Sequence, residues 1–185
     1  MDFQILLWIQ ENLRSEPLNA LWTGITFLGD HGQFWILLSL CLLIPKKTRT
    51  VGLCSLIALI LSLLCTNILL KNLVRRARPF QQYAQLIPLI PAPRDFSFPS
   101  GHTSASFAAA VACFLGFRDR NRWLPAVCPL VLAALIGFSR LYLGVHFPTD
   151  VLAGCLIGCA AGFGGYYVGR KMAASNSHNF YGQNK

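Results

Sequence analysis

The sequence predicts an all-α membrane protein, a polytopic bundle of about five transmembrane helices. Of its 185 residues, 54% are hydrophobic and 12% are charged, and the mean hydropathy is +0.49. Apolar residues are therefore more abundant and more clustered than in an ordinary soluble domain. A spanning helix needs about 20 predominantly apolar residues. The stretches that approach this length are residues 20–44, 51–70, 101–117, 123–138 and 151–169.

The N-terminal residues predict an amphipathic helix lying in the membrane interface as an anchor. The stretch MDFQILLWIQENLRS lacks the basic start, apolar run and cleavage site of a signal peptide. On a helix, one face would be apolar and turned inward: Phe3, Leu6, Leu7 and Trp8. The other would be charged and turned outward: Asp2, Glu11 and Arg14.

Two glycines interrupt the first apolar stretch at Gly29-Asp30-His31-Gly32. Residues 17–28 would then form a short helix leaning into the membrane before the true span. The two glycines favour a solvated helix break at this point. The alternative is that Asp30 and His31 belong to the outer rim of a site.

The basic residues indicate how the chain is oriented. Clusters of Lys and Arg lie at residues 46–49, 118–122 and 170–171. With five spans they fall on one side, which the positive-inside rule makes cytoplasmic. The C-terminus is then cytoplasmic, and the loops at 73–99 and 140–150 face outward. Several outer arginines depart from the rule, and anion binding is the expected reason: Arg75, Arg76, Arg78, Arg94 and Arg140.

A single domain is expected over residues 1–174, followed by a polar, disordered tail at 175–185. The net charge of +9 does not indicate nucleic-acid binding, because the basic residues are confined to the ends of apolar segments. The seven cysteines show no CxxC spacing and lie in or beside apolar segments, where they would serve as packing residues. No cofactor is expected.

The first of three polar segments, Lys71-Asn-Leu-Val-Arg-Arg-Ala-Arg78-Pro79, gathers cations at the outer membrane edge. On a continuous helix ended by Pro79, residues Lys71, Arg75 and Arg78 share one face. Cations so placed repel one another unless an anion lies between them, and arginine offers an anion a planar pair of donors. The alternative is that these side chains reach to lipid headgroups.

The second polar segment, Phe98-Pro-Ser-Gly-His102, precedes the apolar run 105–117. Ser100 is placed as an N-cap, and Gly101 lets a ligand approach the backbone. The N-terminus of a helix is a ready phosphate site, and His102 in the first turn would point at the bound group. The alternative is a well-capped helix with an interfacial histidine.

The third polar segment, residues 139–150, joins the last two spans. Pro148 suits the first turn of the last helix, which places Asp150 inside that turn and His146 just before it. The carboxylate can then accept a hydrogen bond from one imidazole nitrogen and leave the other free as a nucleophile. Arg140 adds a cation. The alternatives are a capping aspartate beside an interfacial histidine, or a metal pair, which the surrounding cations disfavour.

Together the three segments resemble the type-2 phosphatidic acid phosphatase superfamily, which also includes the vanadium haloperoxidases. Residues 71–79 are similar to its KxxxxxxRP motif, residues 99–102 to its PSGH motif and residues 139–150 to its SRxxxxxHxxxD motif. All three are complete and in order, which makes the match far more specific than any single motif.

The resemblance implies a helical bundle and a metal-independent reaction in two steps. The residues that would hold the phosphoryl oxygens are Lys71, Arg78, Ser100, Gly101 and Arg140. His146 would attack phosphorus while Asp150 orients it, and His102 would protonate the leaving oxygen. Water would then cleave the phosphohistidine. Arg75 and Arg76 lie outside the fixed motif positions and have no implied role.

The small size of the chain resembles the bacterial lipid phosphatases of this superfamily. A site facing outward across the plasma membrane favours a lipid whose phosphate is exposed there, so the expected substrate is undecaprenyl pyrophosphate. The alternatives are a phosphatidylglycerophosphate or phosphatidate phosphatase, and a lipid phosphotransferase that uses the same intermediate. A non-catalytic protein that binds anionic lipid is disfavoured, because it would leave His102, His146 and Asp150 without a task.

Overall fold

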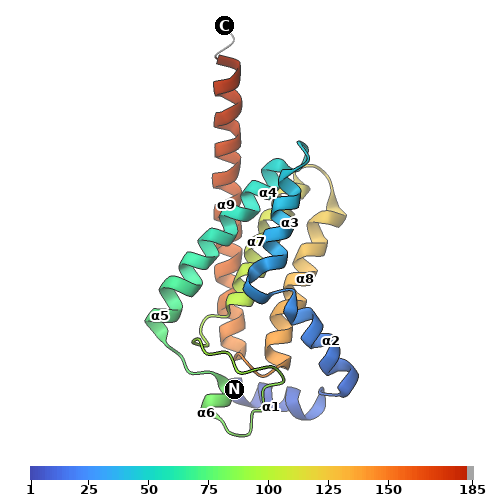
Figure 1. Cartoon of the computed structure of the whole chain (residues 1–185), viewed down its shortest axis with the longest axis vertical. Helices are drawn as coiled ribbons and strands as arrows, with labels where there is room; N and C mark the ends of the chain where they lie inside the picture. Colours follow the sequence, from blue (N-terminus) through green and yellow to red (C-terminus); the bar gives the residue numbers. More distant parts are fainter. Residues whose placement is uncertain (183–185) are drawn as a thin grey trace.

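The computed structural model describes the backbone of residues 1–182 and the side chains of residues 1–175. Every regular element in this part of the chain is a helix, which confirms the predicted all-α class (Figure 1). Apart from Ser175, the predicted tail at residues 175–185 lies outside the described side chains, and residues 183–185 also lie outside the described backbone. The helices follow in this order: α1 (Asp2–Asn12), α2 (Glu16–Phe27), α3 (Gln33–Leu43), α4 (Arg49–Ser62), α5 (Lys71–Val74), α6 (Pro79–Gln82), α7 (Gly101–Arg118), α8 (Trp123–Tyr142) and α9 (Pro148–Gly182).

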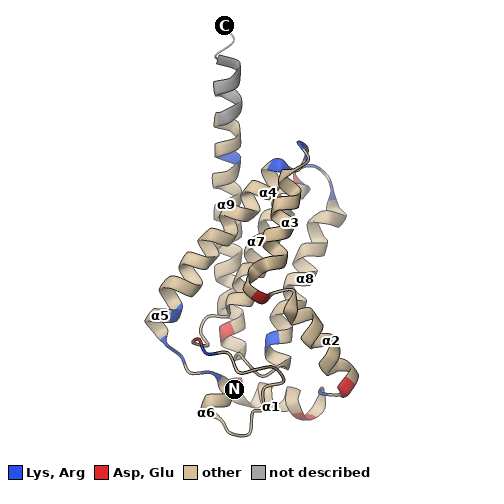
Figure 2. Ribbon diagram, in the orientation of Figure 1, with Lys and Arg blue, Asp and Glu red and all other residues tan. Residues whose placement is uncertain are grey.

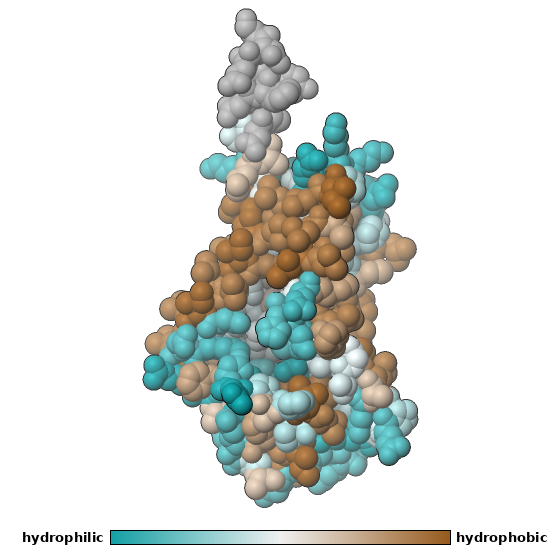
Figure 3. Space-filling model, viewed as in Figure 1, coloured by the Kyte–Doolittle hydropathy of each residue, from teal (hydrophilic) through white to brown (hydrophobic). Residues whose placement is uncertain are grey.

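Four segments in the described chain are long and apolar enough to cross a membrane, so this is a multi-pass membrane protein. They are Glu16–Leu43, Arg49–Gln82, Trp123–Tyr142 and Pro148–Ser175. On the face seen in Figure 3, apolar side chains form a band over the upper helices, with hydrophilic side chains above and below it. These segments correspond to four of the five predicted spans.

The fifth predicted span, α7, is the central helix of the bundle. It packs against α4, α8 and α9 (Figure 1). Its middle is made of fully buried small residues. Because α7 faces other helices and not lipid, it needs close packing more than strong hydrophobicity. This is the reason that α7 is less apolar than the other four segments.

The contact between α7 and α9 is especially close. Cβ atoms added to Gly154 and Gly158 of α9 would lie 2.7 Å from the carbonyl oxygen of Ser100 and 2.5 Å from that of Ser104. Glycines four residues apart allow two helix backbones to meet in this way. As a result, the N-termini of α7 and α9 lie beside each other, and the backbone N–H of Ser100 donates to the carbonyl of Asp150 at 3.0 Å.

Two irregular stretches shape the helices around the site. A 3-10 turn at Asp30–Gly32 joins α2 to α3, with His31 in the left-handed region at a φ of 51°. Between α4 and α5 the chain forms a π-helix over Leu63–Leu70. This stretch places Asn67 so near Gly101 that an added Cβ there would lie 3.0 Å from the amide oxygen. Short π-helical stretches occur frequently at functional sites.

The position of α1 differs in part from the prediction. Leu6 is buried against Leu86 and Phe147, as expected of the apolar face, but Trp8 is 56% exposed. Arg14 is half-buried instead of turned fully outward. It donates to the carbonyls of Tyr142 at 3.0 Å and Ile87 at 2.7 Å. The end of α8 has carbonyls without helical partners, and a nearby arginine satisfies them.

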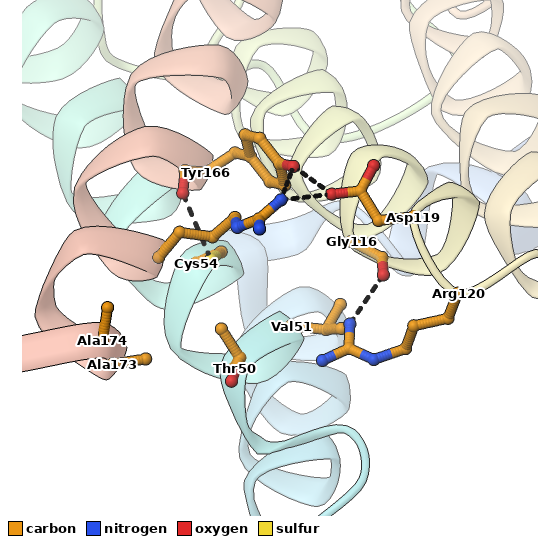
Figure 4. Close-up of a pocket in the computed structure, with 10 residues that line it drawn as sticks. Thr50, Val51, Cys54, Gly116, Asp119, Arg120, Tyr166, Ala173 and Ala174 are labelled. Atoms are coloured by element: carbon orange, nitrogen blue, oxygen red, sulfur yellow. Dashed lines mark hydrogen bonds and ion pairs between the residues drawn. The ribbon is translucent and has the colours of Figure 1, made fainter. Parts of the chain in front are cut away.

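The three basic clusters lie at one end of the bundle, away from the three polar segments (Figure 2). A cavity of about 400 Å³ at that end is lined by Thr50, Arg120 and Arg170, which come from different helices or their ends. Arg170 donates to Asp119 at 2.5 Å, and Tyr166 also donates to this carboxylate (Figure 4). The Tyr166 hydroxyl is the main reason that the pKa of Asp119 is lowered. Arg170 and Asp119 are thus paired with each other at this end of the bundle.

Candidate active site

The three polar segments meet at the end of the bundle where α7 and α9 begin (Figure 1). A cavity of about 890 Å³ lies there. Its lining includes most of the predicted site residues: Lys71, Arg78, Gly101, His102, Arg140 and His146. The two remaining residues, Ser100 and Asp150, are fully buried directly behind it. Lys71 and His146, which lie 75 positions apart in the sequence, are thus brought to a single cavity.

His146 lies in the loop between α8 and α9 and is 1% exposed. Its Nε2 is 3.2 Å from Nη1 of Arg78. Arginine can only donate, so Nε2 is the acceptor and carries a lone pair, and the proton of the neutral ring lies on Nδ1. Burial lowers the pKa of His146, and the charges of Arg78 and Arg140 lower it further. The ring is therefore held neutral, as a nucleophile must be.

The contact between His146 and Asp150 is longer than predicted. Nδ1 of His146 is 3.6 Å from Oδ2 of Asp150 and has no hydrogen-bond partner among the described residues. The reason is that the carboxylate is already occupied. Oδ2 accepts from Ser97 at 2.5 Å and from the backbone of Phe147 at 2.9 Å, while Oδ1 accepts from Arg76 at 2.7 Å. Asp150 thus orients the loop around His146 as well as facing its ring.

Arg76 has a structural role that its place outside the motifs did not reveal. Besides Asp150, it donates to Thr149 at 2.7 Å and to Asp2 at 3.1 Å. Its guanidinium also lies 4.0 Å from the centre of the Phe147 ring. The sequence also did not predict the role of Ser97, which donates a hydrogen bond to Asp150. The available signals were the departure of Arg76 from the positive-inside rule and the position of Ser97 just before the predicted phosphate-binding helix.

Arg75 does not share a helical face with Lys71 and Arg78, so that prediction is wrong. The helix ends at Val74, and Arg75 adopts the left-handed conformation at a φ of 50°. Its side chain is exposed and donates to the nearby carbonyl of Asn72. An αL residue ends a helix by turning the chain away, which lets the extended Arg78 enter the site from another direction.

Lys71 and Arg78 both bind the carboxylate of Asp95, a residue outside the three polar segments. Nη2 of Arg78 donates to Oδ1 at 2.6 Å, and Nζ of Lys71 donates to Oδ2. Burial alone would raise the pKa of Asp95, but the two cations outweigh it and lower the pKa. Arg78 is also anchored by the carbonyls of Asp95 at 2.9 Å and Val145 at 2.7 Å.

The PSGH segment forms the start of α7 as predicted. The Ser100 hydroxyl accepts from the N–H of Thr103 at 3.5 Å and from its hydroxyl at 2.9 Å. Nε2 of His102 lies 2.7 Å from Oδ1 of Asp30, so Asp30 is at the rim of the site and not merely part of a helix break. Burial lowers the pKa of His102, and the carboxylate of Asp30 offsets part of this effect by favouring the protonated imidazole that a general acid requires.

Arg140 is 2% exposed and faces the cavity from the last turn of α8. Its Nη1 donates to the hydroxyl of Thr26 at 2.6 Å, but its Nε has no hydrogen-bond partner among the described residues. Buried donors are almost always paired, so an unpaired guanidinium nitrogen beside a cavity indicates an acceptor supplied by a ligand. Within the described chain, no group of three or more His, Cys, Asp and Glu could hold a metal ion.

A multi-pass helical bundle with cations around a buried, neutral histidine has the architecture of a membrane phosphatase. The model of the PAP2 superfamily matches residues 51–172, which include all three polar segments. The chain belongs to this superfamily and is a membrane phosphatase of it.

Known relatives agree in sequence and in fold. An undecaprenyl-diphosphatase of Sulfolobus acidocaldarius is 33% identical over 136 residues, which cover 72% of this chain and 64% of that protein. A decaprenylphosphoryl-5-phosphoribose phosphatase of Mycobacterium tuberculosis is 30% identical over 164 residues, which cover 87% of this chain and 86% of that protein. The crystal structure of a transmembrane PAP2-type phosphatidylglycerolphosphate phosphatase from Bacillus subtilis superposes with a TM-score of 0.76 at 29% identity, covering 92% of this chain and 85% of that one.

Two neighbouring arginines provide a test of this geometry. We expect Arg76→Gln to lower kcat for phosphate release by up to about 100-fold, because it frees the carboxylate of Asp150 beside His146. Arg75→Gln, one residue away and exposed, is the matched control and keeps wild-type kcat. Equal activity of the two variants in a phosphate-release assay would contradict the role given to Arg76.

Proposed function

We propose that this protein hydrolyses the phosphate of a membrane lipid through a phosphohistidine formed on Nε2 of His146. The observation that carries the proposal is the 3.2 Å contact between this nitrogen and Nη1 of Arg78. The guanidinium identifies Nε2 as the nitrogen with the lone pair. A phosphoryl oxygen that binds Arg78 replaces this contact and brings phosphorus within reach of the lone pair.

The surrounding residues would act on the phosphoryl group as a set. Lys71, Arg78 and Arg140, together with the first N–H groups of α7, neutralise the charge on its oxygens. Nε2 of His146 forms the N–P bond as the bond to the lipid oxygen breaks, and His102 protonates that oxygen. A water molecule then attacks phosphorus and gives its proton to His102. The N–P bond breaks, which releases inorganic phosphate and restores His146.

The proposed substrate is undecaprenyl pyrophosphate. The relative named undecaprenyl-diphosphatase supports it, and so does the apolar side of the cavity, which would accept an isoprenyl chain. The lining residues on this side are Phe27, Ile36, Leu56, Leu59, Ile60 and Leu63. A second candidate is phosphatidylglycerophosphate, favoured by the fold shared with the Bacillus subtilis phosphatase.

His146→Ala tests the chemistry. We expect phosphate release from lipid substrates to fall on the order of 1,000-fold or more, because the variant lacks the nitrogen that attacks phosphorus. With labelled substrate, acid-labile and alkali-stable label should appear on the wild-type protein and not on the variant. Full turnover by His146→Ala would refute the proposal. Label that moves into lipid instead of free phosphate would make the protein a phosphotransferase.

The protonation of His146 provides a second test. Since its folded pKa is lowered, His146 stays neutral at a pH where an ordinary histidine is charged, and it gains its proton only as the pH falls further. The unfolded chain binds that proton first, so this group makes the fold less stable as the pH falls below about 6.5. In an imidazole ¹⁵N NMR titration, the signal absent from His146→Asn should still report a neutral ring at pH 6. A midpoint at or above that of a free histidine would contradict this.

We propose further that the site faces the extracytoplasmic side of the plasma membrane and that the C-terminus is cytoplasmic. The support is the position of the three basic clusters at the opposite end of the bundle. A reporter fused to the C-terminus that functions only in the cytoplasm should therefore be active, and one that functions only outside should be silent. The reverse result would invert the orientation.

A further inference from the structure

We propose that the carboxylate of Asp95 is a built-in competitor of phosphate, which the substrate displaces on binding and which helps to expel inorganic phosphate after the reaction. This inference rests on the proposed function, because it assigns a role within the same cavity. It concerns a residue outside the three motif segments, on the long loop between α6 and α7.

The contacts of Asp95 are those expected of a phosphate. Its two oxygens are bound by different cations, Oδ1 by Arg78 at 2.6 Å and Oδ2 by Lys71. The side chains of Lys71 and Arg78 are only 9% and 2% exposed, so leaving both without a counter-ion would carry a large desolvation cost. Asp95 removes that cost while no substrate is bound. The same donors are then unavailable to a phosphoryl group until the carboxylate leaves.

The carboxylate is free to leave without disturbing the cations. The side chain of Asp95 is 52% exposed, whereas its partners are buried. Arg78 remains anchored by the backbone carbonyls of Asp95 at 2.9 Å and Val145 at 2.7 Å. The loop itself is held by the N–H of Ser97, which donates to the carbonyl of Arg76 at 2.8 Å. Rotation of one side chain is therefore sufficient to exchange one anion for another.

The incoming phosphate carries more negative charge than the carboxylate that it displaces. A carboxylate brings one negative charge, whereas a phosphate monoester brings about 1.5 to 2 and three acceptor oxygens. Besides Lys71 and Arg78, a third donor is already present for the additional oxygen, because Nε of Arg140 lacks a hydrogen-bond partner among the described residues. A phosphate therefore gains contacts that Asp95 does not make, while Asp95, tethered beside the site, returns as soon as the product dissociates.

A purely structural role for Asp95 would have the opposite consequence. If Asp95 served to hold Lys71 and Arg78 in position, its removal would weaken the binding of anions. If it competes with them, its removal strengthens binding, and by a similar factor for every anion that must displace it. The sign of the change separates the two roles.

The test is calorimetric titration of the purified full-length protein in detergent with inorganic phosphate and with methyl phosphate. We expect Asp95→Asn to bind both about 10-fold more tightly, since a neutral amide competes less well than a charged carboxylate for the same donors. Asp95→Glu, which keeps the charge, should stay near wild type. The matched control is Asp119→Asn, which removes another ion-paired carboxylate at the far end of the bundle and should leave the affinity unchanged.

Unchanged or weaker binding by Asp95→Asn overturns the inference and leaves the proposed function intact. Failure of both anions to bind the wild type and Asp95→Asn overturns the proposed function as well. If Asp95→Asn unfolds without an anion, recovery of the folded state in millimolar phosphate supports the exchange, and failure to recover refutes it. In turnover assays, the Ki for inorganic phosphate and the KM for lipid phosphate should fall together.

Discussion

The close approach of α7 and α9 is the constraint on which the site depends. Gly154 and Gly158 leave no side chain between the two helices, so the backbone of α9 rests on the carbonyls of Ser100 and Ser104. The two helix N-termini are therefore neighbours. The positive ends of both helix dipoles point to the same region, where the anion is expected to bind. The loop before α9, which carries His146, is positioned by the same contact.

The second organising feature is the pairing of charge around the cavity. Buried ions are costly unless they have partners, and the cationic groups of the site are matched with carboxylates. The pairs are Lys71 and Arg78 with Asp95, Arg76 with Asp150, and His102 with Asp30. Arg140 differs, because none of the described carboxylates forms an ion pair with it. Its charge is left for the ligand, so the empty site keeps an excess of positive charge that attracts an anion.

The sequence was informative where function is tied to local spacing. Ser100 as a cap, His102 in the first turn of α7 and Asp150 in the first turn of α9 all follow from short-range rules, and the structure places them accordingly. Asp95, Arg76 and Ser97 could not be selected in this way. Their roles depend on contacts between distant segments, and an aspartate or serine in a loop carries no local signal of its partner.

Departures from the predicted helices have the same origin. The spacing of the cations suggested a continuous helix from Lys71 to Pro79, yet the chain leaves the helix at Arg75. Strong hydrophobicity was expected of every span, yet α7 is built of small residues because helices surround it. In both cases tertiary packing outweighs local preference.

The π-helical stretch at Leu63–Leu70 makes this part of the chain sensitive to length as well as to composition. Each residue of an α-helix turns the following side chain by about 100°. The stretch therefore sets the angle at which α5 presents Lys71 to the cavity, while Asn67 within it stays against Gly101. Most substitutions on its lipid-facing side leave that angle unchanged. The loss or gain of a single residue between Ser62 and Lys71 would rotate the lysine away from the phosphate site, so the function depends more on the length of this segment than on its composition.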